Sequence, residues 1–239
     1  MWGVMSVDMA TARSSAIGRP QGDDGRPDPN VTSALAAWAG SAASEHSALL
    51  ALSSARLLVP VVAMLAEADA TTGAEKESEM ALPTLIGNDG RAAIIAFTGI
   101  ETLARWRADA RPVPTPAAGV WHAAAAEGQA VVIDVAGPVP FVVEGARRTA
   151  LAAGQAPPPP HEDPDVVSVA SAVAAAEPAV IEVHLAPAGR DAEGKGADLA
   201  VTLRMASASD VDAATRAARE ITARLSSRFR RGLEIAASL

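Results

Sequence analysis

The fold of this chain is decided by the stretch EKESEMALPTLIGNDGRAAIIAFTGIETLARWRADARPVPTP at residues 75–116, followed by AVVIDVAGPVPFVVEG at residues 130–145. Two largely apolar runs, Met80–Ile86 and Arg91–Phe97, flank the Gly-Asn-Asp-Gly segment at residues 87–90. Because Asn, Asp and Gly adopt the positive φ angles of a tight turn, this pattern predicts a β-hairpin. After its first residue the second run is apolar on both alternating faces, which is typical of a central strand.

The residues after the hairpin predict further helices and strands. Thr98-Gly99-Ile100-Glu101 has the spacing of a capping box, so a helix is expected to begin there with the Thr98 hydroxyl as its cap. Arg111–Pro116 has proline at every second residue and must be extended. The remaining expected elements are a helix at Ala117–Glu127, strands at Ala130–Val135 and Val139–Val143 joined across Gly137-Pro138, and a helix at Ala146–Ala153.

Shifts in composition divide the 239 residues into four parts. Residues 1–30 end in a segment rich in Gly, Pro and Asp, and we expect them to form a disordered tail. Residues 31–153 form the first domain. Residues 154–165, GQAPPPPHEDPD, contain four consecutive prolines, which favour a semi-rigid polyproline II linker. Residues 166–239 form the second domain.

The second domain is expected to have the order helix, strand, strand, helix, strand. Its last helix, Asp210–Leu225, has a predicted buried stripe of Val211, Ala214, Ala218, Ile221 and Leu225. We predict Gly232 as the residue that ends this helix region. The predicted fold class is therefore α/β (α+β): two small domains, the first a mixed β-sheet with flanking helices and the second a small α-β-β-α-β sandwich.

Composition excludes several classes of function. The chain has no cysteine, so disulfides, thiol catalysis and Cys-ligated metals are ruled out. The net charge of −8 disfavours nucleic acid and anionic lipid as partners. No stretch reaches the roughly 18–20 apolar residues of a membrane span, and the N-terminus lacks the pattern of a signal peptide. We expect a cytoplasmic protein that binds neither nucleic acid nor membrane.

With these residues laid out, the chain resembles the SseB-like family, named for enhanced serine sensitivity. The resemblance covers roughly Val31–Ala153 and rests on several short motifs in order. They are LVPVVA at residues 58–63, EKESEMA at residues 75–81, the Asn88-Asp89-Gly90 turn, Phe97-Thr98, Trp106, ARPVP at residues 110–114, and Asp134 with Gly137-Pro138. The resemblance implies an α/β protein of the cytosol without an established enzymatic activity, and it provides no catalytic residues to transfer.

Asp134 is the most unusual residue of the first domain, because it interrupts an apolar strand and a buried carboxylate is costly unless it is hydrogen-bonded or paired. One hypothesis makes it a capping group for backbone amides at the Gly137-Pro138 turn. The other makes it a ligand-binding residue. An amino acid needs one cationic and one anionic partner, and Arg105 or Arg111 together with Asp134 would supply them.

Other motifs favour structural roles. Residues 189–195 have the G-x4-G-K spacing of a phosphate-binding loop but lack the following Ser or Thr and helix. His161-Glu162-Asp163 lies in the proline-rich linker, where we expect solvated side chains and no metal site. Four arginines at residues 224, 228, 230 and 231 complement the dipole of the last helix.

The sequence contains no set of residues that a known reaction requires. We therefore expect a non-enzymatic protein without cofactors, acting as an interaction or regulatory module with an unidentified protein partner or small molecule, and linked to serine or amino-acid metabolism by the family name. The alternative is a sensor that binds an amino acid. An enzyme of a new type, with a polar pocket around Asp134, is the third reading.

Overall fold

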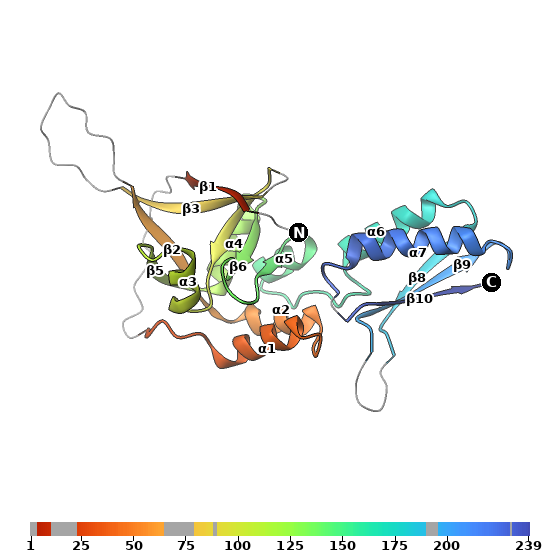
Figure 1. The fold of residues 1–239 in the computed structure, drawn as a ribbon, viewed down its shortest axis with the longest axis horizontal. Coiled ribbons are helices and arrows are strands. Elements are labelled where there is room, and N and C mark those ends of the chain that lie inside the picture. The colour runs from red at the N-terminus through yellow and green to blue at the C-terminus, as the bar shows by residue number, and fades with distance from the viewer. Residues whose placement is uncertain (1–3, 11–22, 65–78, 88–89, 190–195, 230) are drawn as a thin grey trace, which may run out of the picture.

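The computed structural model describes the chain except for residues 1–3, 11–22, 65–78, 88–89, 190–195 and 230. The strands form two sheets, and each sheet has its own helices. The two sheets lie side by side along the long axis of the molecule (Figure 1). The expected α/β class is confirmed. The polar segment after residue 66 and most of the G-x4-G-K segment lie outside the described residues.

The first sheet has the strand order β5-β2-β3-β4-β6-β7, with β1 also paired to β3. Only β4 and β6 are parallel among the pairs of this sheet; the other described pairs are antiparallel. The strands are β1 (Val4–Ala10), β2 (Arg56–Met64), β3 (Glu79–Gly87), β4 (Ala92–Ala96), β5 (Arg111–Pro116), β6 (Ala130–Ile133) and β7 (Phe141–Val143).

The predicted hairpin is confirmed. Strands β3 and β4 pair in antiparallel register, with Leu85 opposite Ala93, and the Gly87 amide donates to the Arg91 carbonyl at 2.9 Å. Gly90 has a φ of +77°, the left-handed conformation that the turn requires. Strand β4 lies between β3 and β6, which makes it central, as its apolar pattern predicted.

The expected disordered tail is corrected at residues 29–30, which begin α1, and at residues 4–10. Residues 4–10 form β1, which pairs with β3 from Val4 opposite Gly87 to Ala10 opposite Leu82. The strand is short and lies before a segment rich in Gly, Pro and Asp, so the composition of that segment hides the strand from sequence analysis. Its stability comes from pairing with a strand far away in sequence, which local composition does not reveal.

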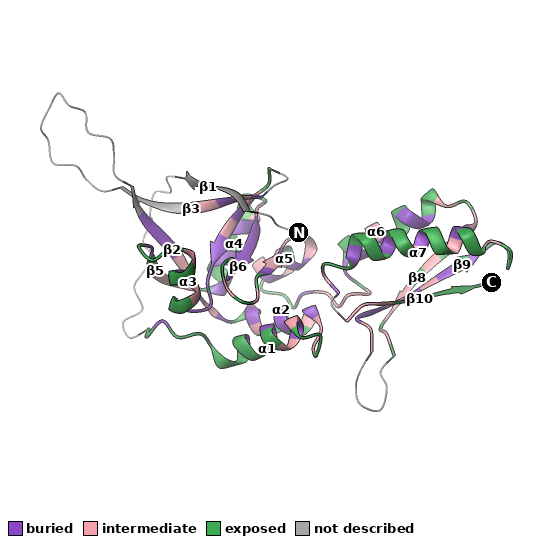
Figure 2. Ribbon diagram, viewed as in Figure 1, coloured by how far each residue is buried: buried purple, intermediate pink, exposed green. Residues whose placement is uncertain are grey.

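Helices cover both faces of this sheet. On one face α1 (Pro29–Ala39), α2 (Glu45–Ser53), α4 (Ala117–Ala126) and α5 (Gly145–Ala152) enclose a core that includes Trp38, Leu49, Trp121 and Phe141. On the other face α3 (Ile100–Trp106) packs over Phe97 and Leu58. Successive residues of β6 alternate between the two cores, Val131 and Ile133 in the first, Ala130 and Val132 in the second. This double burial explains the apolar strands and is visible as the purple centre of Figure 2.

Strand β5 forms one edge of the sheet and is confirmed as extended. The Ala117 amide, at the end of this strand, donates to Ala55 next to β2, and the Leu58 amide of β2 donates in the opposite direction, to Phe97. Because backbone groups alternate along a strand, the residues paired through hydrogen bonds to β2 are the non-proline ones. Pro112, Pro114 and Pro116 therefore fill the outward-facing positions, and that edge presents no N–H from them.

The predicted capping box is wrong. Helix α3 begins at Ile100, its N-cap is Gly99, and no side chain caps it. The Thr98 hydroxyl instead donates to Asp134, so a tertiary hydrogen bond to a carboxylate replaced the local one to the helix amide.

The second sheet has three strands in the order β10-β9-β8. Strand β8 is antiparallel to β9, and β10 is parallel to it. Both helices of this domain lie on one face of the sheet (Figure 1). The elements are α6 (Pro164–Ala176), β8 (Val180–Ala186), β9 (Leu199–Met205), α7 (Val211–Leu225) and β10 (Leu233–Ser238), in the predicted order.

The predicted buried stripe of α7 is only partly correct. Ile221 and Leu225 are buried, but the other buried residues are Ala213 and Ala217, and Val211 is 64% exposed. The helix is rich in alanine over a wide arc, so the periodicity alone did not fix which side faces the core. The helix also ends earlier than Gly232, at Leu225 with Ser226 as its C-cap.

Candidate functional site

Asp134 lies at the end of β6, next to the end of the parallel strand β4. It is buried, with 5% exposure, and has a positive φ of 51°. Its Oδ1 accepts hydrogen bonds from the Thr98 amide at 2.9 Å and the Thr102 hydroxyl at 2.6 Å, and its Oδ2 accepts one from the Thr98 hydroxyl at 2.7 Å. The carboxylate therefore connects the end of β6 to the start of α3.

The backbone around Asp134 is built to keep this position. The Gly137 amide donates to the Asp134 carbonyl at 2.7 Å, and a Cβ at Gly137 would lie 2.9 Å from the Cβ of Asp134. Asp tolerates the left-handed conformation better than most residues, and Gly137 provides the space. The predicted capping of amides at the Gly137-Pro138 turn is wrong in its partner: the carboxylate accepts from the Thr98 amide, and the Gly137 amide donates to the Asp134 backbone carbonyl.

The two arginines of the predicted amino-acid clamp are exposed. Arg105 lies on α3 and Arg111 begins β5. Among the described residues, no ion pair or hydrogen bond joins either arginine to Asp134. The three donors from Thr98 and Thr102 occupy that carboxylate instead. The clamp stays a prediction.

A buried cluster of four charged residues joins the two domains. Glu45 of α2 pairs with Arg147 of α5 through Oε1 and with Arg228, which follows α7, through Oε2 at 3.1 Å. Arg228 also pairs with Asp163 at 2.7 Å. The side chain of Asp163 has 0% exposure. Two cations and two anions therefore neutralise one another at the junction.

The cluster shifts the two arginines in opposite directions. Burial lowers the pKa of Arg147, and the charge of Glu45 only partly offsets this effect. Burial would also lower the pKa of Arg228, but the charges and hydrogen bonds of Glu45 and Asp163 raise it overall. Arg228 is thus the better-compensated cation, because it contacts both carboxylates.

The segment predicted as a solvated linker supplies part of this junction. Asp163 is buried, caps α6 by accepting a hydrogen bond from the Asp165 amide at 2.9 Å, and pairs with Arg228. Pro157 is buried as well. The expectation of solvated side chains is therefore wrong at these residues, because Arg228 arrives from the far end of the chain.

Asp165 makes a second contact across the junction. Its Oδ2 accepts a hydrogen bond from the Ala146 amide at 2.8 Å, at the N-terminus of α5. Gly145 has a φ of +61°, and a Cβ there would lie 2.0 Å from Asp165 Oδ2. The glycine therefore permits a carboxylate in the first turn of α6 to cap a helix of the first domain.

Sequence reasoning missed Glu45, Arg147 and the role of Asp163. Glu45 follows the N-cap Ser44 and looks like an acidic residue of a first helical turn. Its partners are 102 and 183 residues away, beyond the reach of local patterns. One available signal was Asp163-Pro164, since Asp at the N-cap followed by Pro at N1 marks a helix start.

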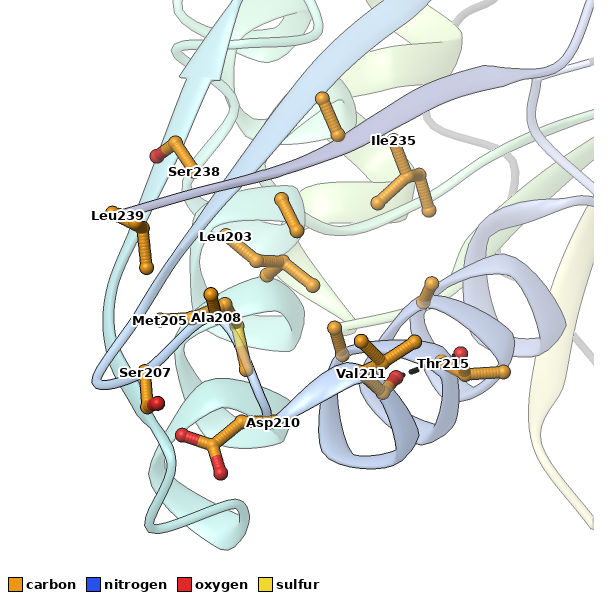
Figure 3. Close-up of a pocket in the computed structure, with 14 residues that line it drawn as sticks. Leu203, Met205, Ser207, Ala208, Asp210, Val211, Thr215, Ile235, Ser238 and Leu239 are labelled. Atoms are coloured by element: carbon orange, nitrogen blue, oxygen red, sulfur yellow. Dashed lines mark hydrogen bonds between the residues drawn. The ribbon is translucent and has the colours of Figure 1, made fainter.

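The C-terminal domain contains an apolar groove of about 460 Å³ between α7 and the strands β9 and β10. Val211, Leu203 and Ile235 point into the space between helix and sheet (Figure 3). Asp210 is the one charged side chain among the described residues that line the groove. Part of the predicted α7 stripe, Val211, Ala214 and Ala218, therefore faces the groove.

Two absences concern the described residues alone. Within them, no three His, Asp or Glu side chains gather as a metal site would require. No helix found in them has the length and apolar character to cross a membrane.

The structure is that of an α/β protein with two sheets, whose helices share a buried charge cluster with the segment between them. Residues 31–147 match the family model of the SseB protein N-terminal domain. This part of the chain belongs to the SseB N-terminal domain family, as its short motifs indicated. No curated protein and no solved structure matches the chain.

Proposed function

We propose that this SseB-like chain is a non-enzymatic interaction module that binds an extended apolar segment of a partner protein along strand β10. Strand β10 is an edge strand, paired to β9 on one side alone among the described residues. The open side of such a strand presents backbone donors and acceptors that a further strand can use. This unpaired edge beside an apolar groove is the observation that carries the proposal.

The groove provides specificity for the added segment. An extended peptide presents alternate side chains to one face, and the groove between α7 and the sheet accepts apolar ones. Asp210 lies at the groove and favours a partner with a basic residue next to its apolar residues. The expected partner is therefore an extended segment with alternating apolar residues and a flanking Lys or Arg.

The other sheet edge of this domain is less suited to such binding. Strand β8 has a register shift between Val180 and Glu182, and it exposes Glu182 and His184. Bulges and charged side chains are two common ways in which proteins prevent edge pairing. Strand β10 exposes Glu234 as its one charged side chain. Of the two edges of the second sheet, β10 is thus the one better suited to pair with a further strand.

The test is a display screen of extended peptides against the full chain, with the selected peptides measured by fluorescence anisotropy. Val211→Glu places a charge in the groove at a residue that is 64% exposed, so folding should be preserved. We expect this variant to lose the selected peptides by about tenfold or more in affinity. Ile181→Glu is the matched control, because Ile181 is 54% exposed on β8 and lies outside the groove.

Two results would contradict the proposal. Equal loss of binding in both variants would place the contact elsewhere or make it a non-specific charge effect. Reproducible turnover of a metabolite by the pure protein would overturn its non-enzymatic part.

A further inference from the structure

A second cavity, of about 610 Å³, lies between the two domains. It is bounded by the start of β4, the turn after α4 and the start of α5 in the first domain, and by α6 and α7 in the second. Five arginines and three carboxylates line it. Arginines outnumber carboxylates in this lining, although the chain as a whole has a net charge of −8.

Two of these arginines are already neutralised. Arg147 and Arg228 pair with Glu45 and Asp163 in the buried cluster. Two others make pairs on the surface: Arg91 with Glu144, and Arg224 with Glu220 within the same helix. Surface pairs contribute about 0–1 kcal/mol, so an incoming anion can exchange with them at little cost.

Arg148 differs from the other four. Its Nη1 donates to the Gln129 carbonyl at 2.7 Å, which fixes the side chain, but none of the described carboxylates pairs with it. Its Nε is buried without an acceptor. This half-buried guanidinium is held in place without a paired carboxylate, so an anion in the cavity could bind it without first breaking an ion pair.

We infer that the cavity between the domains binds a small organic anion through a carboxylate or phosphate group held by Arg148. The planar guanidinium of arginine matches both groups in bidentate geometry. Arg91 approaches from the start of β4 and Arg224 from α7, so both domains contribute cations. The volume is in the range of pockets that hold metabolites. This site is separate from the β10 edge and does not depend on the proposed function.

Isothermal titration calorimetry of the full chain at low ionic strength tests the inference. The probes are inorganic phosphate, pyrophosphate, malonate and citrate, with sodium chloride at equal ionic strength as the reference. We expect saturable binding of at least one probe and none of chloride. Preference for the first two probes identifies a phosphate ligand, and preference for the last two identifies a carboxylate ligand.

Arg148→Gln should weaken that binding by about tenfold or more, because a hydrogen bond to a charged group is lost. Arg219→Gln is the matched control, with the same change in charge at an exposed residue of α7 outside the cavity. The control should bind as the unaltered protein does. Equal weakening in both variants, or none in Arg148→Gln, would overturn the inference.

A second measurement needs no variant. In two-dimensional ¹H–¹⁵N spectra of the unaltered protein, the bound probe should shift the amide signals of Gly128 and Gly145, which line the cavity. Largest shifts at α3 or β10 would place the anion elsewhere and overturn the site. Val211→Glu should bind the anion normally, which keeps this test separate from that of the peptide groove.

Discussion

The outer edges of the two sheets are built in opposite ways. Strand β5 ends the first sheet with prolines at its three outward-facing positions, whereas β10 ends the second sheet without any proline. The two domains also differ in what they leave without a contact. In the first domain the buried carboxylate of Asp134 accepts hydrogen bonds from residues of the same domain. In the second domain an apolar groove lies open beside α7.

The comparison teaches that one chain can restrict association at one edge and leave another available. A proline ring removes a backbone donor, so a further strand cannot complete its ladder on β5. No such protection exists on β10. The β5 edge of the first sheet is therefore closed to a further strand, and the β10 edge of the second sheet is the one that we propose for a partner.

The largest expected effect tests whether the stability of the first domain depends on its contacts with the second. Glu45→Ala removes the carboxylate that binds Arg147 and Arg228, and leaves two buried cations without it. Breaking a buried pair in this way costs about 3–5 kcal/mol. Urea unfolding monitored by circular dichroism would measure the loss. Glu220→Ala, which breaks an exposed pair with Arg224, should change stability far less.

Asp134→Ala removes hydrogen bonds within the first domain and should destabilise it. It leaves the Thr98 amide and two hydroxyls without their acceptor, and places alanine at a positive φ. We expect a loss of about 2–4 kcal/mol, since each unsatisfied buried group costs about 1–3 kcal/mol and the hydroxyls can rotate to other acceptors. Asp134→Asn retains one acceptor oxygen and should lose less. Equal losses in urea unfolding would contradict the hydrogen-bond explanation.

Replacing the prolines of β5 should reduce the contrast between the edges. Pro112→Thr with Pro114→Thr restores two outward N–H groups on a strand whose residues are already extended. Stability should change by less than about 1 kcal/mol, but the protein should self-associate at high concentration. Sedimentation velocity over a range of concentrations measures this. A monomer distribution identical to that of the unaltered protein would show that the prolines do not protect the edge.

The smallest effect is a difference in acid response between two exposed ion pairs. Hydrogen bonding to Arg107 lowers the pKa of Asp109, and hydrogen bonding to Arg216 lowers the pKa of Glu177. A lowered folded pKa stabilises the protein above the ordinary carboxyl pKa, near pH 4, and this contribution is lost as the pH falls further. Arg107 is two residues from Asp109 and can pair with it in the unfolded chain, whereas Arg216 is 39 residues from Glu177.

Acid unfolding therefore distinguishes the two pairs. Glu177→Gln should reduce the pH dependence of stability below about pH 4.3, and Asp109→Asn should leave it nearly unchanged. The measurement is thermal unfolding of both variants between pH 3 and pH 7. A larger effect of Asp109→Asn would mean that its pair forms only in the folded protein.

Much of this fold could be predicted because the signals were local. The Gly-Asn-Asp-Gly turn fixed the β3–β4 hairpin, and alternating prolines fixed the extended conformation of β5. The order of elements in the second domain followed from changes in hydrophobic period. In each case the backbone conformation depends on residues within a few positions.

The rest could not be predicted because the deciding partners are distant. Thr98 had the correct spacing for a capping box, but its hydroxyl donates a hydrogen bond to Asp134, which is 36 residues away. In the sequence Glu45 looks like an ordinary acidic residue of a first helical turn, and only the fold shows that it pairs with Arg228 across the junction. Strand β1 was masked by its neighbours' composition and depends on β3. Arg148 became a candidate site residue only because the fold places it at a cavity where none of the described carboxylates pairs with it.

The cap that Asp165 provides for α5 has a consequence for exchanging the parts of this chain. The segment that matches the family ends at residue 147, within α5, but the carboxylate that caps this helix comes from residue 165. Recombination that joined the first domain to an unrelated neighbour would lose that cap and two members of the buried cluster. The segment that matches the family model is thus shorter than the part of the chain on which the capping of α5 depends.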